Sequence, residues 1–157
     1  IYSGESPTVY RYVDWLITVP LQIVEFYLIL AAVTTVSASL FWKLLVGSLV
    51  MLIGGYMGET EMIGRTLGFV IGMVGWAYVI YLIFFGEAAN VNASSGNAAS
   101  QMAFKTIRMI VLVGWAIYPI GYLMNNAADL NIVYNLADLV NKTAFGLAIW
   151  AAAVSDS

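Results

Sequence analysis

The sequence contains no cysteine and no histidine among its 157 residues. Without cysteine the chain has no disulfide, no iron–sulfur cluster, no thiol nucleophile and no thiolate ligand for zinc. Without histidine it also lacks the usual ligand of haem and catalytic zinc and the usual base of a catalytic dyad. No phosphate-binding loop and no cluster of metal ligands is visible either. These absences argue against an enzyme and predict that no metal is bound.

Charge is also scarce. Charged residues make up 10% of the chain and hydrophobic residues 62%, whereas a soluble domain carries about 25% charged residues. Six Lys and Arg against nine Asp and Glu give a net charge of −3, so the chain has no basic surface for nucleic acid. The high aromatic content of 14% argues against intrinsic disorder. The composition predicts an integral membrane protein.

Five apolar segments have the length of about 20 residues that a membrane-spanning helix needs. They are residues 9–31, 37–57, 62–85, 103–124 and 130–154. Polar residues separate them, notably at 58–61, 86–102 and 125–126. Because these are long continuous apolar runs, helices are favoured over the short alternating strands of a barrel. The sequence predicts an all-α integral membrane fold that forms one domain over residues 1–157.

The first span carries polar side chains that a membrane helix does not need for packing. Arg11, Asp14, Thr18, Gln22 and Glu25 are spaced by three or four residues, so they share one helical face. Ionisable residues inside a span are costly and mark function by default. At 1.5 Å per residue the backbones of Asp14 and Glu25 stand about 16 Å apart. That separation suits two successive proton stations better than a shared acid pair.

The last span contains Asp138 and Lys142, which are one turn apart on the same face. One interpretation is an ion pair that holds the helices together. The other is a reactive amine, because burial favours the neutral form of lysine, which can attack an aldehyde to form a Schiff base. The resulting cation would need carboxylate partners. Asp138 and Asp14 are the candidates.

Aromatic residues accompany this lysine within the spans. Trp115 and Tyr118 lie three residues apart just before Pro119, which removes a backbone hydrogen bond and bends a helix. Trp15 and Trp76 also fall within spans. A single aromatic residue of this kind commonly packs the bundle or sits at the lipid interface. Several of them together with a buried lysine indicate a slot for a flat, conjugated apolar ligand.

Two motifs carry a resemblance to a known family. The segment RYVDWLITVPL at 11–21 resembles the third-helix signature of microbial rhodopsins, and DLVNK at 138–142 resembles their retinal-binding lysine motif. Within the family, Glu25 and the Trp115, Tyr118 and Pro119 group are most similar to proteorhodopsins. The resemblance covers essentially the whole chain. It implies a seven-helix rhodopsin bundle of which five transmembrane helices, the third to the seventh, are present here. The start at Ile1 instead of Met likewise leads us to expect further helices upstream.

The resemblance also implies roles for individual residues. Lys142 would bind all-trans retinal as a protonated Schiff base, with Asp14 as main counterion and first proton acceptor. Asp138 would complete the counterion, and Glu25 would be the proton donor on the cytoplasmic side. Arg11 would tune Asp14 from the outer side, and Thr18 would form a hydrogen bond near it. The residues expected to line the retinal pocket are Trp15, Gln22, Met51, Trp76, Trp115, Tyr118 and Pro119, with Gln22 setting a blue absorption.

These roles predict a light-driven outward proton pump, a multi-pass protein of the bacterial inner membrane. Its partners would be protons and the lipid bilayer, and a homo-oligomer is compatible with the sequence. Chloride pumps have a neutral residue where Asp14 stands, and sensory rhodopsins often lack a donor carboxylate such as Glu25. A sensory photoreceptor remains the first alternative. A retinal-free transporter or channel subunit is the second, although such transporters tend to have internal repeats or interrupted helices.

Overall fold

The computed structural model describes residues 8–124 and 127–157 and is helical throughout, with no strand in those ranges. The helices are α1 (Thr8–Val33), α2 (Ala38–Glu59), α3 (Arg65–Phe84), α4 (Glu87–Ser94), α5 (Ala98–Met109), the π-helical segment η1 (Ile110–Gly114), α6 (Ile117–Tyr122) and α7 (Ala127–Asp156). The predicted all-α membrane fold is confirmed. The connection expected at 125–126 and the N-terminal residues 1–7 lie outside the described residues.

Four stretches of the described chain are long and apolar enough to cross a membrane: 8–33, 38–59, 65–94 and 98–122. The fifth expected span falls on α7, which at 30 residues is longer than α1. Its apolar run is interrupted by Asp138, Asn141 and Lys142. For this reason α7 is not among the four helices whose length and composition suit a membrane span. The residues that lower its hydropathy are the ones expected to be functional.

The polar segment 86–102 is not the loop that its composition indicates. It contains α4 and the start of α5, separated by a turn in which Gly96 has a φ of +67°. Alanine-rich sequence favours helix once a cap is available. Asn97 supplies the cap, because its side-chain oxygen accepts a hydrogen bond from the Ser100 N–H at 2.8 Å. This arrangement is typical of a helix N-terminus.

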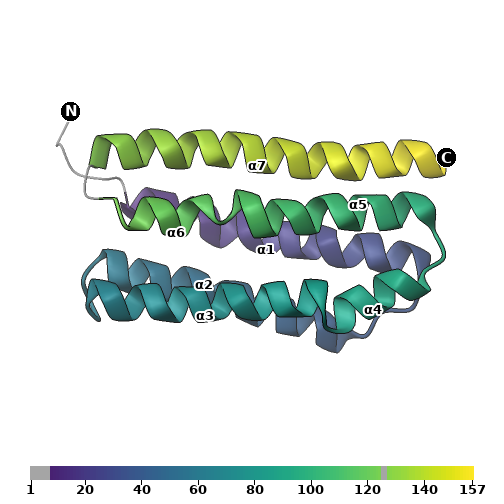
Figure 1. Ribbon diagram of the computed structural model, residues 1–157, viewed down its shortest axis with the longest axis horizontal. Coiled ribbons are helices and arrows are strands. Elements are labelled where there is room, and N and C mark those ends of the chain that lie inside the picture. Colours follow the sequence, from purple (N-terminus) through teal and green to yellow (C-terminus); the bar gives the residue numbers. More distant parts are fainter. Residues whose placement is uncertain (1–7, 125–126) are drawn as a thin grey trace.

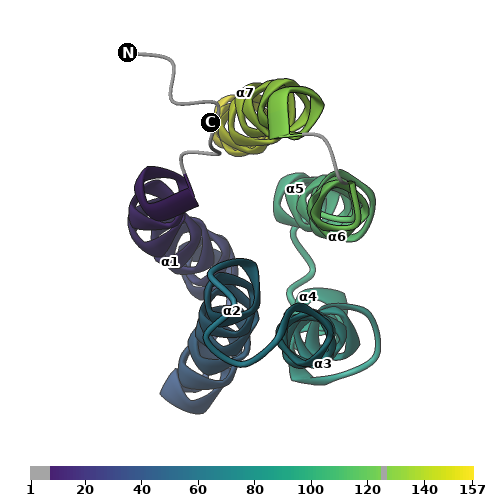
Figure 2. The ribbon, with the colours of Figure 1, turned by 90° about the vertical axis from the view of Figure 1, so that its left-hand side faces the viewer.

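The long helices lie side by side as a bundle, with α1 and α7 running in the same direction (Figure 1). Seen end on, the order around the bundle is α1, α2, α3, then α5 with α6, then α7 (Figure 2). Direct packing joins neighbours in this order, and α1 also contacts α5. The core includes Leu30, Leu44 and Ile107, which are fully buried. The candidate site lies between the helices of this ring.

The outer surface of the bundle is apolar. Leu16, Val74, Leu147 and Trp150 are each more than half exposed, which is the reverse of a water-soluble helix bundle. A contiguous apolar surface of this kind belongs in hydrocarbon, where every backbone polar group must be satisfied within the helices. The fold therefore presents its polar residues to the interior and to the helix ends.

Candidate functional site

The centre of the site is an amine between two carboxylates. Lys142 on α7 donates a hydrogen bond from Nζ to Oδ2 of Asp14 on α1, at 2.7 Å. Oδ1 of Asp138, one turn earlier on α7, lies 4.0 Å from the same nitrogen. The side chains of Asp14, Lys142 and Asp138 are 48%, 32% and 17% exposed. The structure thus brings together the three ionisable groups that the sequence singled out on two separate spans.

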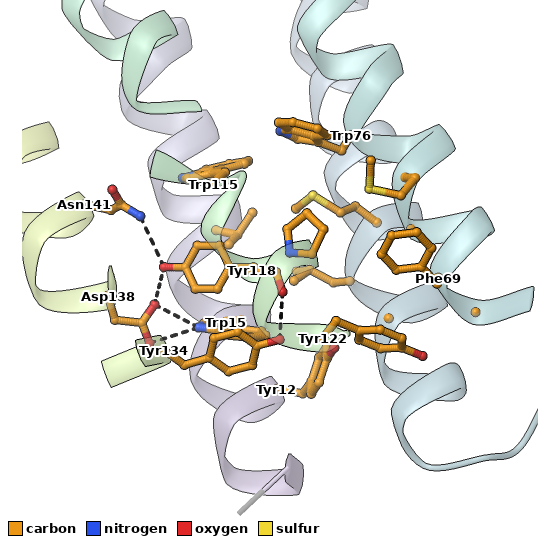
Figure 3. Close-up of a pocket in the computed structure, with 18 of the residues that line it drawn as sticks. Tyr12, Trp15, Phe69, Trp76, Trp115, Tyr118, Tyr122, Tyr134, Asp138 and Asn141 are labelled. Carbon is orange, nitrogen blue, oxygen red and sulfur yellow. Dashed lines mark hydrogen bonds between the residues drawn. The ribbon is translucent and has the colours of Figure 1, made fainter. Parts of the chain in front are cut away.

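The two carboxylates are held differently. Trp15 donates its indole N–H to both oxygens of Asp138 at 3.1 Å, and the Tyr118 hydroxyl donates to Oδ1 at 2.6 Å. These donors come from α1 and α6, so Asp138 is fixed from two sides (Figure 3). Donors of this kind hold a carboxylate in a defined orientation. Asp14, in contrast, accepts a hydrogen bond from Lys142, and its side chain is 48% exposed.

A pocket with aromatic walls extends from the amine into the bundle. Its lining comes from α1, α2, α3, α6 and α7 (Figure 3). Every residue predicted to hold the ligand lines it: Trp15, Gln22, Met51, Trp76, Trp115, Tyr118, Pro119 and Lys142. Such a site, mostly apolar with a few polar groups at one end, is typical of small-molecule pockets.

Several lining residues were not predicted from the sequence. Tyr12, Phe69, Tyr122, Tyr134 and Asn141 also line the pocket. Tyr134 lies one helical turn before Asp138, and this spacing was the one available signal for it. Tyr12, Phe69 and Tyr122 could not be separated from packing residues, because aromatic side chains are common throughout the chain. Asn141 belongs to the lysine motif at 138–142, but the motif alone gave it no role.

Edge-to-face contacts make one wall of the pocket rigid. Trp15 packs against Tyr12 and Tyr118 with ring centroids 5.0 Å apart in each case, and against Tyr134 at 5.4 Å. The Tyr134 hydroxyl in turn donates to the main-chain carbonyl of Tyr118 at 2.8 Å. Aromatic pairs in these geometries add about 0.5–1.5 kcal/mol each beyond their buried area. The donor to Asp138 is therefore held within a packed cluster.

The wall formed by α5, η1 and α6 is irregular because of Pro119. Proline has no N–H, so the Trp115 carbonyl loses its usual helical donor and instead accepts from Tyr118 N at 3.2 Å. The Gly114 carbonyl, which Tyr118 N would reach in an α-helix, accepts from the Asn141 side chain at 3.0 Å. A side chain from α7 thus replaces a missing main-chain bond.

A second displaced carbonyl lies at the other end of η1. Trp115 N bonds to the Ile110 carbonyl at 3.0 Å, five residues back instead of four. Val111 would be its partner in an α-helix, and the Val111 carbonyl accepts from the Trp76 indole at 3.1 Å. Trp76 belongs to α3, so helices on both sides of η1 supply donors to it. The irregular span places Trp115 and Tyr118 in the pocket.

Arg11 and Thr18 do not touch the pocket. Arg11 is buried, forms an ion pair with Glu59 at 3.3 Å, bonds to Asn131, and lies 4.6 Å from the centroid of the Tyr134 ring. Glu59 was expected in a connection between spans but ends α2. The Thr18 hydroxyl donates to the main-chain carbonyl of Asp14 at 3.0 Å and not to its carboxylate.

Glu25 lies in a separate cavity. This cavity, of about 330 Å³, is lined by α1, α5 and α7, and Asp156 also lines it. Glu25 itself is exposed. Along α1 it stands about 16 Å from Asp14 by helix rise. The structure therefore places the predicted donor on the same helix as Asp14 but outside the aromatic pocket.

A lysine that faces two carboxylates at the end of an aromatic pocket, inside a membrane helix bundle, defines a rhodopsin-like protein. The sequence profile of the bacteriorhodopsin-like proteins matches residues 1–156, and the chain belongs to this family. The family predicted from the two motifs is confirmed.

Among its relatives, the chain is 52% identical to a green-light absorbing proteorhodopsin of Gamma-proteobacterium EBAC31A08, covering 100% of the chain and 66% of that protein. It is 53% identical to a blue-light absorbing proteorhodopsin of Gamma-proteobacterium Hot 75m4, covering 100% and 65%. The chain thus spans just under two thirds of the length of these relatives.

Solved structures agree with this assignment. The crystal structure of a blue light-absorbing proteorhodopsin from Med12 is 57% identical, with a TM-score of 0.81 over 100% of this chain and 72% of that one. The crystal structure of Exiguobacterium sibiricum rhodopsin is 37% identical, with a TM-score of 0.80 over 93% and 66%.

Proposed function

We propose that the protein is a light-driven outward proton pump that carries retinal covalently on Lys142. The observation that supports this most directly is the 2.7 Å contact between the Lys142 amine and Asp14 at the end of the aromatic pocket. Retinal would supply light absorption and a titratable nitrogen. The residues fit it, because the pocket offers an amine at one end and flat indole and phenol walls beyond it.

The two carboxylates would have different tasks. Asp138 already accepts hydrogen bonds from Trp15 and Tyr118, and these hold its carboxylate in place as a fixed partner of the cation. Asp14 accepts from Lys142 itself, at hydrogen-bond distance. Proton transfer needs this direct contact. We therefore assign Asp14 as the acceptor and Asp138 as the second counterion.

Glu25 would return a proton from the other side. It lies on α1 beyond the pocket, in a cavity that also contains Asp156. A carboxyl group at this distance cannot share a proton directly with Asp14, so it suits a separate, later step. A donor of this kind favours a pump over a photoreceptor, which gains nothing from rapid reprotonation.

Attachment is tested by trapping. In the full-length protein supplied with retinal, Lys142→Ala should abolish the colour and the retinyl peptide recovered after borohydride reduction, because its amine is the one in the pocket. Lys105→Ala is the matched control, since Lys105 is exposed on α5 and should leave both unchanged. A retinylated peptide recovered from Lys142→Ala would overturn the assignment.

Direction and donor are tested in illuminated cells. Cells that carry the full-length protein should acidify an unbuffered medium, and a protonophore should abolish the signal. Asp14→Asn should stop pumping. Glu25→Gln should slow the recovery of the chromophore after a flash while the colour stays nearly the same. Glu87→Gln is the control, because Glu87 pairs with Lys43 away from the pocket.

Each contrary result has a definite meaning. A coloured protein that does not acidify the medium would favour the sensory photoreceptor instead. Unchanged recovery kinetics in Glu25→Gln would remove Glu25 from the donor role. A full-length chain that takes up no retinal at all would favour the retinal-free transporter.

A further inference from the structure

Asn141 connects the lysine-bearing helix to the irregular span. Its amide donates to the Gly114 carbonyl at 3.0 Å, and it stands directly before Lys142 on α7. The side chain is buried, with 5% of its surface exposed. A hydrogen bond from a buried amide to a displaced carbonyl is costly to break, because both groups would lose their partner.

The contact is tight as well as polar. A Cβ atom added to Gly114 would lie 2.9 Å from Cγ of Asn141, so glycine allows the amide to lie against the main chain. The same amide nitrogen is 3.5 Å from the Tyr118 hydroxyl, which donates to Asp138 (Figure 3). Asn141 therefore contacts both the backbone of the irregular span and the network around the counterion.

The two donors to η1 come from helices with different roles. Trp76 lies on α3, which bears none of the ionisable site residues, and donates a hydrogen bond to the Val111 carbonyl. Asn141 holds the Gly114 carbonyl from α7, next to the reactive amine. A displacement of α7 at Lys142 would move one donor and leave the other in place. Such a displacement would therefore act on η1 through the Gly114 carbonyl.

We propose that Asn141 is a positioning residue that couples α7 at Lys142 to the geometry of η1; the functional consequence rests on the proposed retinal attachment at Lys142. While the amide holds the Gly114 carbonyl, η1 keeps its π-helical register. When the bond is lost, the segment relaxes toward an α-helical register. Because a π turn holds one extra residue, this change shifts α5 by about one residue, or about 1.5 Å of rise, relative to α6.

Selective labelling tests the hydrogen bond itself. The sequence contains two Gly-Trp pairs, Gly75–Trp76 and Gly114–Trp115. With ¹³C-carbonyl glycine and ¹⁵N-tryptophan, NMR should therefore give two cross-peaks. Asn141→Ala should shift the Gly114–Trp115 peak and leave the other as an internal reference. Asn135→Ala, an exposed asparagine on the same helix, should shift neither.

Spin labels test the coupling, and the absence of cysteine from the chain permits clean labelling. Labels at Ser39→Cys on α2 and Met102→Cys on α5, both exposed positions, report how α5 lies against the bundle. In the dark, Asn141→Ala should change this distance by about 1.5 Å, the rise of one residue. A control pair at Ser39→Cys and Tyr81→Cys should not change, because α2 and α3 pack directly together.

Illumination of the retinal-loaded full-length protein should also change the Ser39–Met102 distance, and Asn141→Ala should remove that change. If Asn141→Ala leaves the dark distance as in the parent, or responds to light as the parent does, the coupling is wrong. Either result would overturn the coupling even if Asn141→Ala shifts the Gly114–Trp115 NMR peak. Because the dark measurement needs no pumping, a protein that failed to pump would still report on the coupling.

A second variant covers the case in which Asn141→Ala does not fold. Gly114→Ala replaces no pocket side chain but puts a Cβ against Asn141. It should displace the amide and produce the same change in the Ser39–Met102 distance. An unchanged distance in Gly114→Ala would overturn the proposal independently.

Discussion

The α2–α3 pair and the α1–α7 pair are joined by opposite means. Helices α2 and α3 meet through glycines: a Cβ added at Gly68 would lie 2.7 Å from the Gly54 carbonyl oxygen and 2.6 Å from the Gly58 nitrogen. Helices α1 and α7 meet through polar side chains, including the contacts of Asp14 with Lys142 and of Trp15 with Asp138.

The glycine contacts hold two helices together, whereas the polar contacts involve residues of the candidate site. In a membrane, close backbone approach between small residues supplies van der Waals contact that lipid cannot match. Polar contacts between helices contribute less than their strength in isolation and are costly if left incomplete. The α2–α3 pair can therefore serve as a rigid wall of the pocket, through Met51, Phe69 and Trp76. The α1–α7 pair carries the groups that we propose to change charge during pumping.

The largest expected effect breaks the glycine contact. Gly68→Leu should lower the free energy of unfolding by about 3 kcal/mol, because its Cβ meets main-chain atoms that no rotamer can move aside. Unfolding of the full-length protein in a denaturing detergent titration measures this. Gly146→Leu is the matched control: it lies on α7 with nothing within 4 Å of the added Cβ, and should not destabilise. Equal stability of the two variants would contradict the assignment of close packing to α2–α3.

A smaller effect is expected on the polar side. Trp15→Phe keeps an aromatic ring in the wall but removes the N–H that bonds to both oxygens of Asp138. The loss should be about 2 kcal/mol, the range for a hydrogen bond to a charged group. Trp42→Phe, at a position 59% exposed on α2, should cost little in the same titration. If both variants were equally stable, the indole would serve only as packing.

The same contrast decides what could be predicted from the sequence. The regular helices were predictable because their apolar runs are long, and the Asp14, Asp138 and Lys142 group because charges are rare in such runs. The π-helical η1 was not, because its register depends on donors from Trp76 and Asn141, which are distant in sequence.

Two further features could not be predicted from the local sequence. The polar segment 86–102 forms helix because its alanines favour helix and because Asn97 caps α5. The pairing of Arg11 with Glu59 joins residues 48 positions apart, and nothing in either local pattern indicates it. Partners of this kind are set by which helices become neighbours, which periodicity alone does not determine.

The smallest effect on stability is expected at Gln22, where the change should appear in colour instead. Gln22 is 8% exposed and lines the pocket two turns beyond Asp14 on α1. As a hydrogen bond between helices alone it would contribute about 1 kcal/mol. As a fixed amide dipole in a weakly screening pocket, it also acts on the charge of a bound cationic chromophore. If retinal is bound to Lys142 as we propose, that charge would lie near the Lys142 nitrogen in the ground state and move along the polyene on excitation. The dipole would then stabilise the ground state more and shift absorption to the blue. Gln22→Leu should therefore move the absorption maximum to longer wavelength while retinal stays attached to Lys142. Gln101→Leu, outside the pocket on α5, should leave the spectrum unchanged. A maximum that stays in place or moves further to the blue in Gln22→Leu would mean that this amide serves only in packing.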